Sequence, residues 1–376
     1  MGSTIFPYVS GILMEPLTHA FGWTRSEFSF AFLLQVLVGL FAGPFFGRVI
    51  DRFGPRRVIL AGIPVATCGL SLLGLVGQNI WQWWALVVFQ GLAMAPVLPV
   101  AWVAVVVARF EINRGLALAV ALAGVGLGAA VWPALGTLVI GRLGWRATFP
   151  ALGVGWGLIV FALASLLLKD EPQSHDTFGT KRQNPSPRDA LRSPIFLLTA
   201  AGSVFITVVY GFNLHLVSIL KGFGFSLTAA ATVAGFAGVS AVVGRLLMGL
   251  LLDRLPTRPM ALGVFMLPLL AIALFWNAHE ANWVPMVAVI LLGLSLGAET
   301  DIIAFVASRQ LEPRVFASSY AVAAAAFGAC SALGPLLASL AFDATHSYRV
   351  FFIAAGPAIL FGAVLIAMVP MRPKTD

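Results

Sequence analysis

The sequence predicts an all-α membrane protein, with twelve transmembrane helices in two pseudo-symmetric six-helix bundles. The composition, the number of long apolar stretches and an internal repeat lead to this prediction. Of the 376 residues, 60% are hydrophobic and 10% are charged, whereas a soluble domain has roughly 45–50% apolar and 25% charged residues. A chain of this composition cannot cover a water-facing surface, so soluble enzymes and nucleic-acid-binding domains are excluded.

Twelve apolar stretches are long enough to cross a bilayer core of about 30 Å, which takes about 20 helical residues. They lie near residues 2–20, 28–50, 58–77, 83–108, 115–140, 148–168, 194–219, 228–252, 260–277, 284–308, 315–340 and 349–370. None shows the alternation of β-barrel strands, so each predicts a helix. Glu15 and Pro16 interrupt the first stretch, which predicts either a short helix or part of a longer one.

Basic residues are shared unequally between the predicted loops. Sixteen Lys and Arg residues fall in one alternating set of loops, five fall in the other, and Arg48 and Arg245 lie inside helices. Cytoplasmic loops of membrane proteins are rich in Lys and Arg, so the first set of loops and both termini are expected in the cytoplasm. The expected location is the inner (plasma) membrane of the cell, which the chain would cross several times. The net charge of +8 therefore follows from topology and requires no nucleic-acid partner.

A single long hydrophilic segment, residues 169–193, contains three prolines and mixed charges, a composition typical of a linker. It predicts an N-terminal bundle of residues 1–168, a cytoplasmic linker, and a C-terminal bundle of residues 194–376. The two halves also repeat at an offset of about 202 residues. The corresponding pairs are Phe21-Gly22-Trp23-Thr24 with Phe223-Gly224-Phe225-Ser226, Asp51-Arg52 with Asp253-Arg254, Arg56 with Arg258, and Gly91-Leu92 with Gly293-Leu294. This pattern indicates duplication of a six-helix unit, with a substrate site between the halves near the midplane.

Residues 47–57 read Gly-Arg-Val-Ile-Asp-Arg-Phe-Gly-Pro-Arg-Arg. This segment resembles the signature Gly-x-x-x-Asp-Arg-x-Gly-x-Arg-Arg that lies between helices 2 and 3 of the major facilitator superfamily, and every fixed position matches. A degenerate copy at residues 249–258 and the twelve expected spans extend the resemblance over the whole chain. The resemblance implies that superfamily's fold and a transporter rather than an enzyme.

The charges of this signature are candidates for gating. They are Asp51, Arg52, Arg56 and Arg57, with Asp253 and Arg254 in the second half. Such a cluster can hold the two halves together on the cytoplasmic face in one state and release them in another. The alternative is anchoring of helix ends by arginines at the headgroups. Gly47 is expected to allow close helix approach, and Gly54 to allow a turn with positive φ.

A narrower resemblance is to the monocarboxylate-transporter and oxalate/formate-antiporter branch. It is carried by the segments 16–27 and 144–146, by His215 ahead of the turn 222–226, and by Arg245. Arg245 stands where this branch carries its anion-binding arginine. Proton-coupled members have an acid four residues earlier, where this chain has Ala241. The resemblance therefore implies organic-anion transport but leaves the site of proton coupling open.

Arg245 is expected inside the membrane, in the cytoplasmic half of the helix at 228–252. An arginine stays charged when buried and can form two parallel hydrogen bonds with a carboxylate, so we expect it to bind the substrate. The alternative is an ion pair with Glu299 or Asp301 of the helix at 284–308, and two acids near one arginine also leave room for a cationic substrate. These two acids are two residues apart, so they point to different sides of a helix. Either is a candidate proton carrier.

Glu15 and His215 are expected at similar depths in the outer parts of the two halves. They are candidates for a pH-sensitive gate or a proton site, with a structural hydrogen bond as the alternative for His215. Tyr210 and Asn213, on the same predicted helix as His215, are further candidates for substrate binding.

The sequence as a whole predicts a secondary active transporter for a small organic anion, a mono- or dicarboxylate, that is proton-coupled or works by exchange. The alternative is an efflux transporter for amphipathic or drug-like compounds, whose cavity the many Phe and Met side chains would line. Neither the five His nor the two Cys residues form a spaced cluster, and no phosphate-binding Gly-Lys loop is present. No enzyme activity, metal or cofactor is therefore expected. The expected partners are the substrate and the lipid bilayer, and the expected state is a monomer.

Overall fold

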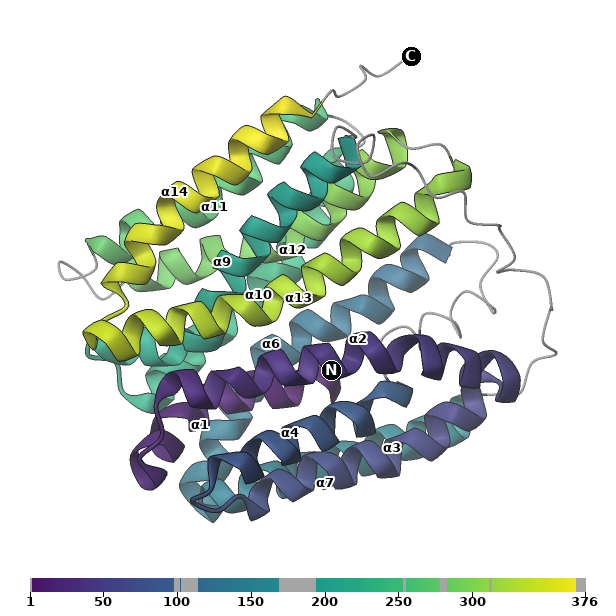
Figure 1. Cartoon of the computed structure of the whole chain (residues 1–376), viewed down its shortest axis with the longest axis vertical. Coiled ribbons are helices and arrows are strands. Elements are labelled where there is room, and N and C mark those ends of the chain that lie inside the picture. The colour runs from purple at the N-terminus through teal and green to yellow at the C-terminus, as the bar shows by residue number, and fades with distance from the viewer. Residues whose placement is uncertain are drawn as a thin grey trace. The chain divides into compact units, whose positions relative to one another are not determined.

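The structure is a computed structural model. It describes residues 2–97, 102, 114–168, 194–252, 255–277, 283–310 and 313–369, without the side chains of 44, 51, 114–123, 194–196, 252, 300, 301 and 303–325. The described part contains twelve α-helices and no β-strand (Figure 1). They are α1 (Ile5–Phe21), α2 (Arg25–Phe53), α3 (Pro55–Leu72), α4 (Ile80–Met94), α6 (Arg114–Leu143), α7 (Trp145–Leu167), α9 (Pro194–Gly222), α10 (Leu227–Leu252), α11 (Thr257–Trp276), α12 (Val284–Gln310), α13 (Pro313–Thr345) and α14 (Arg349–Met368). The predicted fold class is confirmed.

Ten of the described helices are long and apolar enough to cross a membrane. The other two are α1, which has 17 residues, and α12, whose apolar part is Val284–Glu299. A helix satisfies its own backbone hydrogen bonds, which is what a segment surrounded by hydrocarbon requires. The chain is therefore a multi-pass membrane protein.

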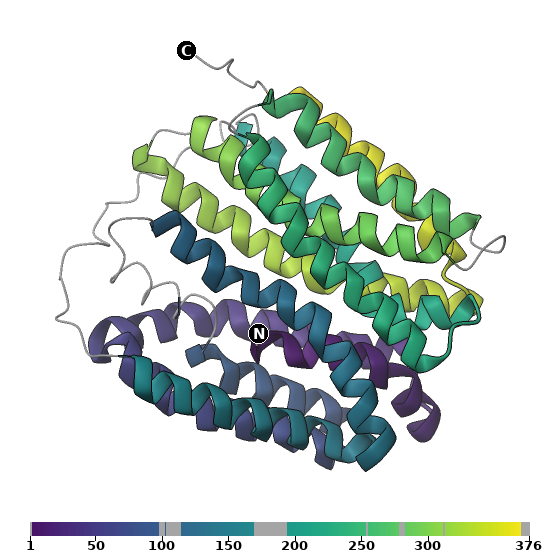
Figure 2. The ribbon, with the colours of Figure 1, turned by 180° about the vertical axis from the view of Figure 1, so that it is seen from behind.

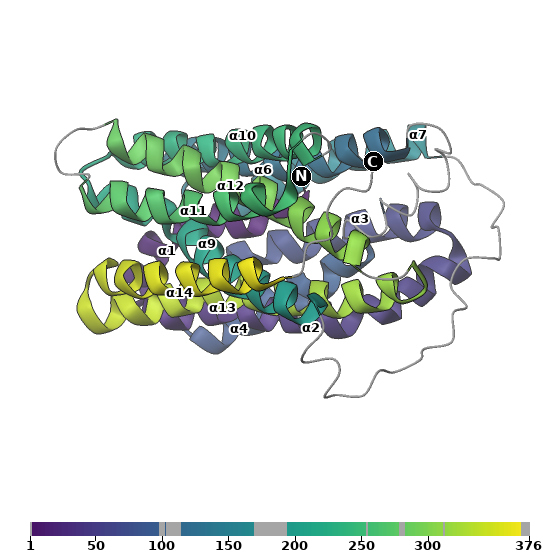
Figure 3. The same ribbon diagram turned by 90° about the horizontal axis from the view of Figure 1, so that it is seen from above.

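The described helices form two compact units. The first comprises residues 1–175 and 225–235, and the second comprises residues 176–224 and 236–376. In the first unit, α3 packs along α7 and α2 packs along α4 (Figure 2). In the second unit, α9 packs along α13 and α11 packs along α12 (Figure 3). The predicted linker at 169–193 lies outside the described residues, so the bundle boundaries stay a prediction.

The turns before α2 and α10 show that the sequence repeat recurs in the local structure. Gly22 and Gly224 both have positive φ, 71° and 89°. Two residues after each glycine, a hydroxyl begins the next helix. The Thr24 Oγ1 atom accepts a hydrogen bond from the Glu27 amide at 3.1 Å, and the Ser226 Oγ atom accepts one from the Ala229 amide at 3.2 Å. Each cap satisfies an amide that has no partner within its helix.

Helix crossings repeat in the same way. A Cβ atom added at Gly91 of α4 would lie 3.2 Å from Gln35 of α2. A Cβ atom added at Gly293 of α12 would lie 2.8 Å from the Cα atom of Ala237 on α10. Ala237 and Gly293 are the residues that the offset of 202 assigns to Gln35 and Gly91. In both cases, the absence of a side chain lets two helices approach closely.

Candidate functional site

The arginine that recurs in both copies of the signature, Arg56 and Arg258, caps the C-terminal end of the last helix of each half. The Arg56 Nε atom at the start of α3 donates to the carbonyl oxygen of Leu168, which follows α7, at 2.7 Å. The equivalent Arg258 at the start of α11 donates to the carbonyl oxygen of Ala367 at the end of α14. The last carbonyls of a helix have no partner within it and carry partial negative charge, so a guanidinium there is stabilising.

Gly54 is in the left-handed region with φ of 82°, as predicted. Among the described residues, no atom lies within 4 Å of a Cβ atom added at Gly47, so the close helix approach expected there stays a prediction. Arg52 and Arg57 are exposed, and the Arg52 guanidinium lies over the ring of Phe53. The side chain of Asp51 and both residues Asp253 and Arg254 lie outside the described part, so gating by this cluster stays a prediction.

Arg245 begins beside a direct contact between the backbones of α10 and α12. A Cβ atom added at Gly297 would lie 2.7 Å from the carbonyl carbon of Ala241, and one added at Gly244 would lie 3.0 Å from that of Leu294. Small residues permit this approach. Arg245 directly follows Gly244; its side chain is half-buried, and its Nε atom is shielded from solvent.

Glu299 is buried in the second unit, with 1% of its surface exposed. Within the described residues, neither carboxylate oxygen has a hydrogen-bond partner. Glu299 follows Gly297 by two residues, so on an α-helix it is rotated by about 200° from the side that contacts α10. It shares its side of α12 with Ser295 and Ile302, both fully buried.

His215 on α9 is hydrogen-bonded to α13 and to Tyr348, the residue before α14, in the interior of the second unit. Its Nδ1 atom lies 2.9 Å from the Tyr348 hydroxyl, and its Nε2 atom lies 3.0 Å from the Pro335 carbonyl oxygen and 3.1 Å from the Ser339 hydroxyl. A carbonyl oxygen can only accept, so a neutral ring carries its hydrogen on Nε2 and accepts from Tyr348 at Nδ1. This geometry favours the structural alternative for His215, and its role at a gate stays a prediction.

The remaining candidates are partly accessible or lie outside the described side chains. Glu15 on α1 and Asn213 on α9 are half-buried, and Tyr210 on α9 is 37% exposed. Position 301 lies on α12, but the side chain of Asp301 is not among those described. The second unit holds Arg245, Glu299, Tyr210, Asn213 and His215, whereas the first holds Glu15 and the signature at 47–57. No group of three or more His, Cys, Asp or Glu residues suited to a metal ion occurs among the described residues.

Comparison of the sequence with models of known protein families identifies the family of the chain. The family model described as Major Facilitator Superfamily matches residues 1–330 of the chain. The chain belongs to the major facilitator superfamily. The predicted family and the prediction of a transporter rather than an enzyme are confirmed.

Several relatives within the superfamily carry more specific names. The chain is 25% identical to the 3-(3-hydroxy-phenyl)propionate transporter of Escherichia coli, over 96% of this chain and 89% of that protein. It is 24% identical to monocarboxylate transporter 4 of Rattus norvegicus, over 97% and 79%. It is 28% identical to a multidrug resistance protein of Serratia proteamaculans, over 91% and 82%. It spans 64% of the length of an MFS-type transporter from Gibberella moniliformis, at 24% identity over 72% of this chain.

A crystal structure of a bacterial homolog to the human lysosomal transporter Spinster, in an inward-facing and occupied conformation, has the same fold. The TM-score is 0.69 with 16% sequence identity, over 98% of this chain and 91% of that chain. At this identity the likeness concerns the fold alone.

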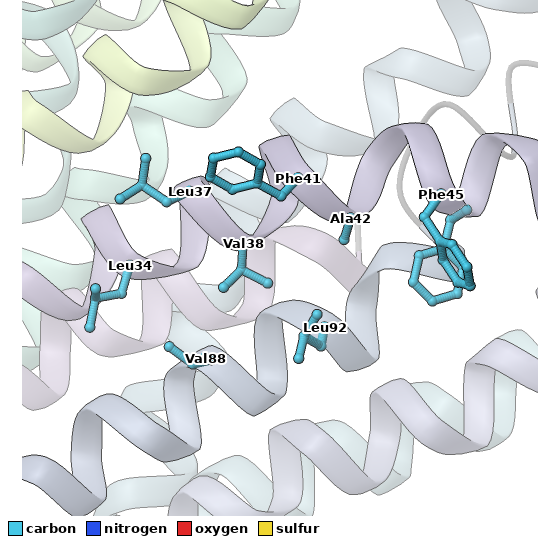
Figure 4. Close-up of a pocket in the computed structure, with 9 residues that line it drawn as sticks. Leu34, Leu37, Val38, Phe41, Ala42, Phe45, Val88 and Leu92 are labelled. Carbon is cyan, nitrogen blue, oxygen red and sulfur yellow. The ribbon is translucent and has the colours of Figure 1, made fainter.

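Two features of the first unit were not predicted from the sequence. An apolar groove of about 590 Å³ runs between α2 and α4, and Phe41, Phe45 and Leu92 are among the nine side chains that line it (Figure 4). The Gln35 amide donates to the Gln90 side chain across the same pair of helices. The intramembrane position of both glutamines was a signal for such a bond, because a polar side chain in hydrocarbon seeks a partner on a neighbouring helix.

Proposed function

We propose that the chain is a secondary active transporter for a small organic anion, a mono- or dicarboxylate. Transport occurs by alternating access of two halves, residues 1–168 and 194–376, joined by the linker 169–193. The observation that carries the proposal is Arg245, a half-buried guanidinium within a membrane-crossing helix. A charge inside a membrane helix is unfavourable, by about 2.5–3.5 kcal/mol at the helix centre, so such residues mark function. A guanidinium also matches the geometry of a carboxylate.

The names of two relatives support the anionic class. One relative is a hydroxyphenylpropionate transporter and the other is a monocarboxylate transporter, and both match nearly the whole of this chain. Their substrates share a carboxylate and differ in the rest of the molecule. On this proposal, Arg245 binds the shared carboxylate, and Tyr210 and Asn213 of α9 bind the remainder of the substrate.

The distribution of Lys and Arg residues supports an orientation with both termini in the cytoplasm of a cell and the protein in its plasma membrane. In that orientation, Arg56 and Arg258 lie at the cytoplasmic ends of the helices that they close. The six helices of each half can then move as one body, as a rocking mechanism requires. The expected unit of transport is a monomer.

Replacing Arg245 by glutamine tests the proposal. The purified protein is reconstituted in liposomes, and counterflow of labelled acetate, lactate, 3-phenylpropionate and succinate is measured. Loss of a charge-assisted hydrogen-bond pair of about 1.5–3 kcal/mol lowers the counterflow of the preferred acid about 10- to 150-fold. Arg142→Gln, an exposed arginine in the last turn of α6, is the matched control and keeps the wild-type rate. Wild-type counterflow of every acid by Arg245→Gln refutes the role of Arg245.

Efflux of an amphipathic compound is the second candidate function. The apolar groove between α2 and α4 supports it, as does the multidrug resistance relative. Under this alternative, the wild-type protein shows no counterflow of any acid. It instead exports an apolar aromatic dye from liposomes at a rate that Arg245→Gln leaves unchanged.

A further inference from the structure

The candidate acids differ in their surroundings within the second unit. Among the acids of this unit whose side chains are described, Glu299 is buried and Asp343 of α13 is partly exposed. The neighbours of Glu299 along α12, Ala298 and Ile302, belong to an apolar cluster with Phe205 of α9 and Phe265 of α11. Glu299 therefore presents a carboxyl group to the apolar interior of the helix bundle.

We propose that Glu299 is the proton-binding site that couples transport to a proton gradient. This inference rests on the proposed anion transport and adds the coupling ion and its residue. Both carboxylate oxygens are shielded and have no hydrogen-bond partner among the described residues. A bare carboxylate removed from water without a partner is strongly unfavourable. In this packing, the carboxyl group therefore carries a proton.

The titratable groups on the helices around α12 leave Glu299 without a counter-charge in the described part. They are Tyr210, His215 and Lys221 on α9, Arg245 on α10, Arg258 on α11, and Cys330 and Asp343 on α13, together with Asp301 and Arg309 of α12 and Arg314 and Tyr320 of α13, whose side chains are not described. Both ring nitrogens of His215 are hydrogen-bonded within its own cluster. Arg258 is bound to the end of α14. Arg245 begins on the side of α12 that Glu299 faces away from.

Proton occupancy and helix packing are linked by this geometry. The packed arrangement around Glu299 is compatible with the neutral carboxyl group, and ionisation favours an arrangement in which the group reaches water. The proton in turn favours the packed arrangement to the same extent, because such coupling is reciprocal. The carboxylate gains its proton from water on the more acidic side and returns it to water on the other side. A monocarboxylate moved together with this proton transfers no net charge, and the substrate undergoes no covalent change.

The test separates gradient-driven accumulation from exchange. In liposomes whose outside is one pH unit more acidic than the inside, transport of one proton with each acid molecule raises the internal concentration of the acid about tenfold. Glu299→Gln has nearly the same shape but cannot titrate. We expect it to retain counterflow at equal pH and to show no accumulation under the gradient. Asp343→Asn makes the same chemical change at a partly exposed site and keeps the tenfold accumulation.

Each outcome has a distinct meaning. Accumulation by Glu299→Gln at the wild-type level overturns the proposal, as does a wild-type protein that exchanges the acid but ignores the gradient. A wild-type protein without counterflow of any acid overturns the proposed function instead. If Glu299→Gln shows no counterflow, Glu299→Asp decides the matter. Gradient-driven accumulation by this variant supports the proposal, and absence of accumulation or of counterflow overturns it.

Discussion

Replacing Gly297 by alanine probes the contact of α12 with α10 beside Arg245. The added Cβ atom would overlap the Ala241 carbonyl oxygen and lie 2.7 Å from the carbonyl carbon. Real Cβ atoms essentially never come within 3.0 Å of such neighbours, so the two helices must move apart. Overpacking of this kind costs about 1–3 kcal/mol. The better helix propensity of alanine offsets at most about 1 kcal/mol.

The matched control is Gly249→Ala on α10, because a Cβ atom there would meet none of the described atoms within 4 Å. We expect Gly297→Ala to lower the free energy of unfolding by about 1–2 kcal/mol and Gly249→Ala to leave it unchanged or raise it. Thermal unfolding in detergent and stepwise denaturation in mixed micelles measure the difference. If Gly297→Ala is as stable as Gly249→Ala, the close contact between the two backbones is refuted.

Two further substitutions test hydrogen bonds described above by the same unfolding measurements. His215→Ala removes the ring that joins Tyr348 to α13, and leaving these buried groups unpaired lowers the free energy of unfolding by about 2–4 kcal/mol. His19→Ala, at an exposed position, should have no effect, and equal stability of the two variants would contradict the buried cluster. Arg56→Gln removes the hydrogen bond to the carbonyl at the end of α7 and lowers the free energy of unfolding by about 1–2 kcal/mol. Arg57→Gln, at an exposed position, should leave the free energy of unfolding unchanged. Equal losses for the two variants would argue against the capping role of Arg56.

The family and the all-helical fold class could be predicted because hydrophobicity and the signature at 47–57 are properties of the chain itself. The helix boundaries were harder to predict. The second helix begins at Arg25 rather than near residue 28, because Thr24 and Glu27 form a capping box that starts it earlier. The fourth stretch changes from α-helix to a 3-10 turn at Ala95–Val97, where Pro96 lacks the amide hydrogen that a continuous α-helix would use.

The surroundings of the polar residues could not be predicted to the same extent. In a soluble helix the apolar face marks the interior, but in a membrane both the lipid-facing and the interior-facing sides are apolar. The sequence of α12 therefore shows that Glu299 and Asp301 diverge without showing which of them is enclosed. The partners of His215 lie more than 100 residues away along the chain, and only the packing of α13 against α9 brings them together.

The capping arginines have a consequence for the history of the gene. Arg56 and Arg258 each bind the final helix of their own half, so neither half borrows this contact from the other. An ancestral polypeptide with six spans would therefore already have had the hydrogen bond to the end of its final helix, before the gene was duplicated and fused. If the chain is divided between residues 169 and 193 and the two halves are expressed from separate reading frames, each half keeps this contact.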